Sequence, residues 1–115
     1  MNAKKLGDVF FDEFISLTKE MQNAGSSLGK ASHKAYTSLF DMTQSNKGIK
    51  KLASQGFDEN LIQKAGEYIN TSHNNVIRNG MKMFGDSPKY SAMLENQQVW
   101  DTLMNNTRNT LNKWS

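Results

Sequence analysis

The sequence contains no cysteine, a single proline and no long apolar run. Without cysteine the chain forms neither disulfides nor thiolate metal sites, which fits a reducing compartment. No segment approaches the roughly 18–20 consecutive apolar residues of a membrane-spanning helix, so we expect no transmembrane segment. The N-terminal segment mixes its lysines with Asp8, Asp12 and Glu13 and does not resemble a signal peptide. We therefore expect a cytoplasmic protein.

Large aliphatic residues are also scarce, because Leu, Ile, Val and Phe together number 23 of the 115 residues. Asn, Ser, Thr and Gln number 37, so much of the chain is polar but uncharged. Seven methionines and eleven aromatic residues supply the remaining bulky apolar contacts. A core this thin favours self-association or adsorption to an apolar surface, and we expect a homo-oligomer.

The sequence also lacks a large excess of charge of either sign. Its 14 basic residues are interspersed with 11 acidic ones, and the formal charge is +3. A mildly basic, solvated surface explains this balance better than a nucleic-acid interface. Lys47, Lys50 and Lys51 form the densest basic cluster. Compensation of a helix dipole or a solvated link is the favoured interpretation, and phosphate binding is the alternative.

What the chain does contain is helical periodicity, most clearly near the C-terminus. Ser87 is a suitable helix N-cap and Pro88 suits the first helical position, so the sequence predicts one helix over residues 88–113. Its apolar stripe recurs at alternating spacings of three and four residues. The members are Tyr90, Met93, Gln97, Trp100, Met104, Thr107, Leu111 and Trp114.

A second stripe of the same period predicts a long helix over residues 8–46. The stripe consists of Phe10, Phe14, Leu17, Met21, Ala24, Leu28, Ala31, Ala35, Ser38 and Met42. Gly25 and Gly29 weaken its middle, which is either a loop between two helices or a weak point in one helix. The unchanged phase of the stripe favours continuity, and a helix end is expected at Asn46–Gly48.

The middle of the chain predicts a third helix over residues 58–84, which begins at the cap Asp58 and ends at Gly85. A short helical turn is expected between Ile49 and Ser54. No stretch shows convincing β alternation. The prediction is a single all-α domain over residues 1–115, an elongated, coiled-coil-like bundle with three main amphipathic helices.

Chemistry-bearing residues are sparse and isolated along the sequence. His33 and His73 lie 40 residues apart, and neither has a carboxylate or a second histidine at helical spacing, so both are interpreted as structural. Adjacent carboxylates such as Asp58 and Glu59 fall at helix starts, where dipole compensation explains them. We therefore predict no catalytic residues, no cofactor and no metal, and a protein that is not an enzyme.

Amphipathicity is the remaining functional signal. The apolar faces either bury one another in a bundle or oligomer, or some of them lie on an apolar surface as interfacial helices do. Composition and period favour the first interpretation.

The C-terminal segment resembles the phasins, small helical proteins that coat polyhydroxyalkanoate storage granules in bacteria. The resemblance rests on Asp86-Ser87-Pro88, followed by Leu94-Glu95 and Gln97 before a final amphipathic helix. Long, weakly apolar helices without cysteine are the second shared feature. The pattern covers about the last 30 residues, and the rest of the chain matches only in character.

The resemblance implies a non-enzymatic, granule-associated coat protein that adsorbs to the polyester, controls granule size and stability, and has polymer synthase as a further partner. The alternative is an oligomeric helical adaptor or scaffold protein. A weaker third interpretation is a nucleic-acid-associated protein that uses the lysine cluster. The residues expected to contact the surface or partner are Phe10, Phe14, Leu17, Met21, Met93, Trp100, Met104, Leu111 and Trp114.

Overall fold

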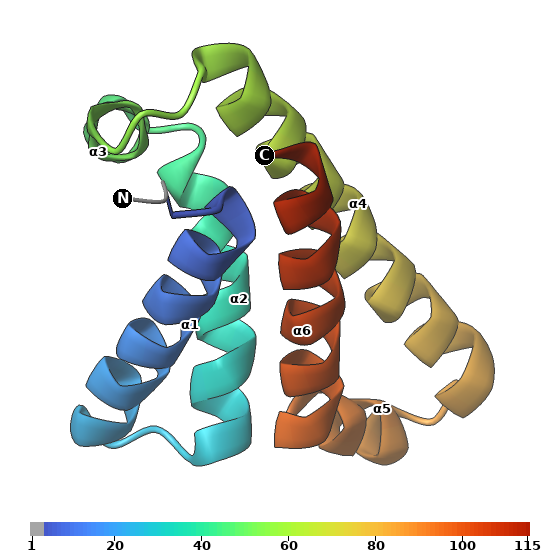
Figure 1. Cartoon of the computed structure of the whole chain (residues 1–115). Helices are drawn as coiled ribbons and strands as arrows, with labels where there is room; N and C mark the ends of the chain where they lie inside the picture. Colours follow the sequence, from blue (N-terminus) through green and yellow to red (C-terminus); the bar gives the residue numbers. More distant parts are fainter. Residues whose placement is uncertain (1–3) are drawn as a thin grey trace.

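A computed structural model describes residues 4–115, which form six helices and no strand (Figure 1). The helices are α1 (Leu6–Asn23), α2 (Leu28–Met42), α3 (Asn46–Ser54), α4 (Glu59–Phe84), α5 (Ser87–Leu94) and α6 (Gln97–Trp114). The all-α prediction is confirmed at this level. The helices are more numerous and shorter than predicted, because two of the expected helices are interrupted.

The predicted continuous helix over residues 8–46 is wrong. It breaks after α1, where Gly25 takes a φ of +107°, a left-handed conformation that glycine adopts without the steric penalty of a Cβ. Ser27 then caps α2, and its hydroxyl accepts a hydrogen bond from the Lys30 amide at 3.4 Å. The chain reverses here, so α2 lies against α1 instead of extending it (Figure 1).

The end of α2 also precedes the predicted one. The helix stops at Met42, and Asn46–Gly48, expected as a helix end, instead opens α3. The Ser45 hydroxyl caps this new helix by accepting from the Gly48 amide at 3.0 Å. The turn expected between Ile49 and Ser54 is therefore the later part of α3.

The third predicted helix, over residues 58–84, corresponds to α4. The Asp58 carboxylate accepts from the Asn60 amide at 3.2 Å at the start of α4, and the helix ends at Phe84 with Gly85 as its C-cap. With 26 residues α4 is the longest helix, and it packs on both α2 and α6.

The predicted single helix over residues 88–113 is wrong as well, because Glu95 and Asn96 separate α5 from α6. Asn96 caps α6 by accepting from the Gln98 amide at 3.0 Å. Trp100 reinforces the turn, since its indole Nε1 donates to the Leu94 carbonyl at 2.7 Å. Asp86, not Ser87, occupies the N-cap of α5.

The core forms where α1, α2, α4 and α6 meet, and the stripe of α6 faces it. Trp100, Met104, Thr107 and Leu111 are all buried on that face, so the predicted side of this helix is correct even though the helix is shorter. The described chain measures 47 × 30 × 25 Å. The predicted continuous helix over residues 8–46 would be roughly 55–60 Å long at 1.5 Å per residue, which exceeds the longest of these dimensions.

A polar contact joins the two ends of the chain. The Asp8 carboxylate of α1 accepts from Arg108 Nε at 2.9 Å and from Asn112 Nδ2 at 3.1 Å on α6. The hydrogen bond from Asn112, followed by that from Arg108, lowers the pKa of Asp8 from its ordinary value. The contact aligns α1 with α6 along the face that carries the core residues.

Candidate functional site

Most of the predicted contact residues lie inside the bundle. Phe10, Phe14, Trp100, Met104 and Leu111 are at most 2% exposed and share one core. The remaining four, Leu17, Met21, Met93 and Trp114, are partly buried. In the folded chain, the nine residues therefore mainly form the interior of the bundle.

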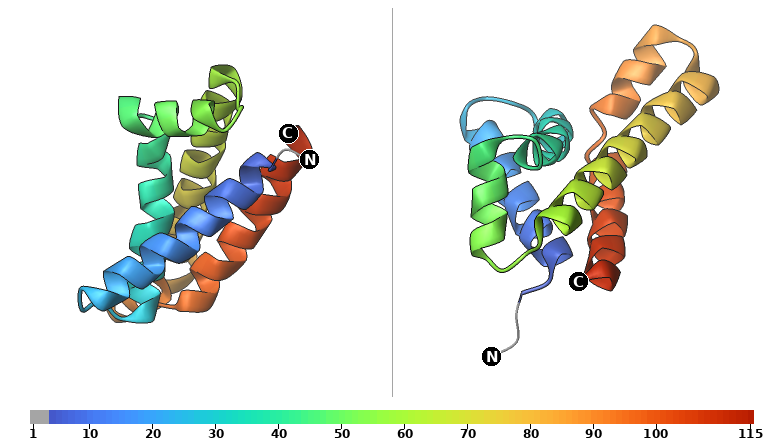
Figure 2. Two further views of the ribbon diagram at one scale, coloured as in Figure 1. Left: turned by 60° about the vertical axis from the view of Figure 1, so that its left-hand side comes forward. Right: turned by 90° about the horizontal axis from the view of Figure 1, so that it is seen from above.

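Met93 lies apart from the others, in a projecting hairpin. We call this hairpin the arm and define it as residues 76–94, the end of α4 together with α5. Val76, Ile77 and Leu94 at its base pack against the core, and Figure 2 shows the remainder extending away from the rest of the molecule in the view from above. Met93 and Tyr90 of α5 pack over Gly80 of α4, where an added Cβ would lie 2.5 Å from the Met93 sulfur.

The arm carries the most exposed large apolar side chains of the described chain. Met83 is 75% exposed and Met81 is 59% exposed, and α5 buries no residue. Basic residues flank these methionines, since Arg78, Lys82 and Lys89 are exposed on the arm and Asp86 is its only acid. The arm is thus an apolar surface with a basic border. The sequence did not predict that this surface is exposed, because the exposure depends on the helix break at Glu95–Asn96.

A stack of aromatic rings fills the space between α2, α4 and α6. The rings of His33 and Trp100 are 4.2 Å apart between centroids, and those of His73 and Trp100 are 5.6 Å apart. The two histidines, 40 residues apart in sequence, meet with their Nε2 atoms at 3.4 Å. Sequence spacing carried no signal for this pair, because the contact depends on how three helices pack.

The protonation of this stack follows from its burial. Burial, and then the proximity of His73, lower the pKa of His33, and burial also lowers the pKa of His73. A hydrogen bond between two Nε2 atoms needs one protonated and one bare nitrogen, as in a pair of neutral imidazoles. Among residues 4–115 no group of three or more His, Cys, Asp or Glu is placed to hold a metal ion.

Tyr36 adjoins the stack and is fully buried. Its hydroxyl lies 3.1 Å from Thr107 Oγ1, which in turn donates to the Leu103 carbonyl at 2.8 Å. Burial raises the pKa of Tyr36 to about 12, so the phenol stays protonated at neutral pH. Thr107, an interruption of the apolar stripe, therefore supplies the hydrogen-bond partner of a buried tyrosine.

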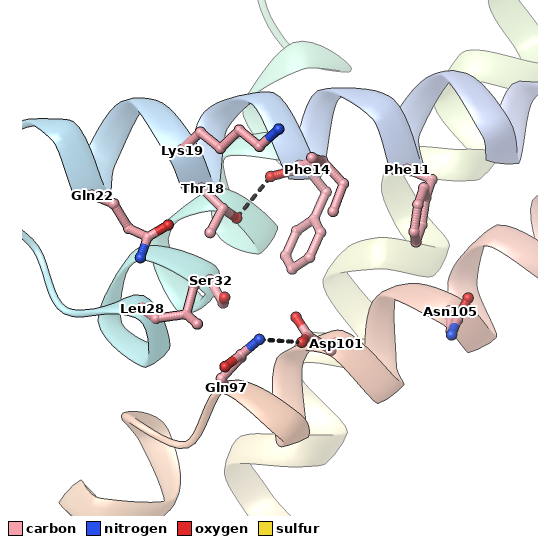
Figure 3. A pocket seen from close by; sticks show the side chains of 11 residues that line it. Phe11, Phe14, Thr18, Lys19, Gln22, Leu28, Ser32, Gln97, Asp101 and Asn105 are labelled. Atoms are coloured by element: carbon pink, nitrogen blue, oxygen red, sulfur yellow. Dashed lines mark hydrogen bonds between the residues drawn. The ribbon is translucent and has the colours of Figure 1, made fainter.

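A pocket of about 340 Å³ opens between α1, α2 and the start of α6 (Figure 3). Phe14, Ile15 and Leu28 form apolar walls, while Ser32, Gln97 and Asp101 provide polar groups. The Ser32 hydroxyl is fully buried and has no hydrogen-bond partner among the described residues. An unpaired buried hydroxyl costs about 1–3 kcal/mol, so this atom is the conspicuous polar feature of the pocket.

The lysine cluster lies on α3, and all three side chains are exposed. Lys51 forms an ion pair with Glu13 of α1, which reduces the positive charge available to a phosphate. Lys47 and Lys51 line a shallow groove beside Leu17 and Met42.

None of the helices in residues 4–115 is long and apolar enough to cross a membrane. No known protein family, curated protein or solved structure matches the chain.

Proposed function

We propose that this protein is a non-enzymatic coat protein that adsorbs through its arm to the apolar surface of polyhydroxyalkanoate granules. The observation that supports the proposal is the exposure of Met81 and Met83 on a hairpin that projects from the bundle. Methionine is flexible and polarizable, which suits contact with an irregular surface. In this proposal the core stays folded and the arm provides the contact.

The two exposed methionines supply the apolar part of the adsorption energy. Burying one methionine side chain contributes roughly 1.5–3 kcal/mol, and these two are only partly covered in the free protein. Together they supply about 2–4 kcal/mol, on the basis of that transfer value. The polar bundle then faces water, where a layer of folded domains would limit granule coalescence and control granule size.

The adsorption experiment uses polyhydroxybutyrate particles and purified protein. Replacing Met81 and Met83 together by Ser should weaken co-sedimentation at least tenfold, because about 1.4 kcal/mol corresponds to a tenfold change in the dissociation constant. Binding of the unsubstituted protein should change little between low and high salt, since the contact is apolar.

The matched control replaces Ile15 and Leu28, which are 38% and 37% exposed and lie at the pocket, by Ser. This variant should bind particles like the unsubstituted protein. If neither protein sediments with particles at any salt concentration, the proposal is wrong.

The same apolar arm also suits the alternative, an oligomeric helical adaptor that assembles arm to arm. Light scattering separates the two proposals. A discrete oligomer that dissociates in the Met81→Ser, Met83→Ser variant and has no affinity for particles would favour the adaptor.

A further inference from the structure

The pocket between α1, α2 and α6 has the features of a small-molecule site and shares no residue with the arm. Its volume of about 340 Å³ falls at the lower end of the range for ligand pockets, roughly 300–1,000 Å³. That space accommodates one aromatic ring with a short substituent. Two of the four most exposed large apolar residues of the described chain, Ile15 and Leu28, lie at this pocket.

The pocket also carries polar groups that are incompletely paired. Figure 3 shows Phe14 and Asp101 pointing toward each other across the pocket, with Ser32 beside them. Asp101 accepts from Gln97 Nε2 at 2.9 Å, and an ionised carboxylate has further lone pairs to offer. The Ser32 hydroxyl, fully buried and unpaired within the described chain, supplies both a donor and an acceptor.

These groups define the charge of the ligand. Asp101, which lines the pocket, repels an anion. Lys19, the only cationic residue that lines the pocket, is exposed on α1 and forms no ion pair with Asp101 in the described chain. A hydroxyl or ammonium group would donate to Asp101 and satisfy Ser32, while the apolar body would cover Phe14 and Ile15.

We propose that this pocket binds a small neutral or cationic molecule that has a ring-sized apolar body and one hydroxyl or amino group. The orphaned Ser32 hydroxyl is the observation that points to a ligand, because most buried polar groups have a hydrogen-bond partner and this one has none within the described chain. The site goes beyond the granule-coat proposal and is independent of it.

Three probes of nearly the same size test the charge requirement: 2-phenylethylamine, 2-phenylethanol and phenylacetate. In ¹H–¹⁵N spectra of the whole chain, the amine and the alcohol should give saturable shifts at the amides of Ile15, Ser32 and Asp101. The carboxylate should bind at least tenfold more weakly. The absence of saturable shifts with every probe, or tighter binding of the carboxylate, would overturn the proposal.

Two variants separate the roles of the polar groups. Asp101→Asn retains an oxygen that accepts from Gln97 but loses the charge, so the amine should bind more weakly than to the unsubstituted protein while the alcohol still binds. Ser32→Ala should weaken the alcohol and raise the thermal unfolding midpoint, because it removes an unpaired buried hydroxyl. The control is Asp41→Asn, an exposed carboxylate of another groove, which should leave probe binding unchanged. Equally tight binding of the amine by the Asp101→Asn and Asp41→Asn variants would contradict the assignment.

Discussion

At the scale of single residues, the side chains that interrupt the apolar stripes have definite partners. Thr107 hydrogen-bonds the buried Tyr36, and Gln97 hydrogen-bonds Asp101 at the pocket. His33 and His73, unremarkable in the sequence, stack on Trp100 in the interior. These polar groups give the thin core specific hydrogen bonds and ring contacts where additional leucines would otherwise be needed.

The histidine stack predicts a pH dependence of stability. Since burial holds both pKa values below the ordinary 6.5, the unfolded chain takes up protons below about pH 6.5 before the folded chain does. Their contribution to stability is therefore complete above that pH and is lost as the pH falls toward the lowered values. The thermal unfolding midpoint should drop between pH 7.5 and pH 5.5, and the drop should shrink in the double variant His33→Asn, His73→Asn. A midpoint that is flat or rises across this range would contradict the assignment. The Asp8 contribution is lost only below about pH 3.8.

At the scale of helices, the period of the sequence predicted the helical class and the buried face of α6, but it did not locate the breaks. Asn96 caps α6, yet in a chain with 13 asparagines such a cap is not distinctive. Gly25 and Gly29 look alike in the sequence, but Gly25 makes a turn while Gly29 lies within α2. The two glycines differ because α2 approaches the link between α5 and α6 at Gly29. This approach depends on how the helices pack, so the sequence alone does not reveal it.

Replacing Gly29 by alanine should therefore change the free energy of unfolding. The sign of the change tests how closely α2 packs against the link between α5 and α6. A Cβ at this position would lie 1.4 Å from the Glu95 carbonyl oxygen, so Gly29→Ala should destabilise the fold by about 1–3 kcal/mol, the usual range for overpacking. Helix propensity alone would favour alanine by up to about 1 kcal/mol. Urea unfolding measures the difference.

The control is Gly80→Ala, whose added Cβ meets mainly the flexible end of Met93. It should cost clearly less than Gly29→Ala. Equal effects, or a more stable Gly29→Ala variant, would show that α2 does not approach the link this closely.

At the scale of the whole molecule, the scarcity of large aliphatic residues predicted a chain that seeks an apolar partner, and it named the stripe residues as the contacts. The fold instead buries the main aromatic residues of both stripes, including Phe10, Phe14 and Trp100, and leaves methionines exposed on the arm. The sequence could not distinguish these outcomes, because the same periodicity describes a face that packs inside one chain and a face that meets something else. The assignment of contact to the arm depends on the chain reversals at Gly25 and Glu95–Asn96.

Hydrogen exchange of the protein bound to polyhydroxybutyrate particles tests this assignment most directly. Adsorption through a folded molecule predicts slower amide exchange in residues 76–94 than in the free protein, with unchanged exchange in α1, α2 and α6. Faster exchange in α1 and α6 on the particles, with no protection of the arm, would show that the bundle opens and that the buried stripe is the contact surface.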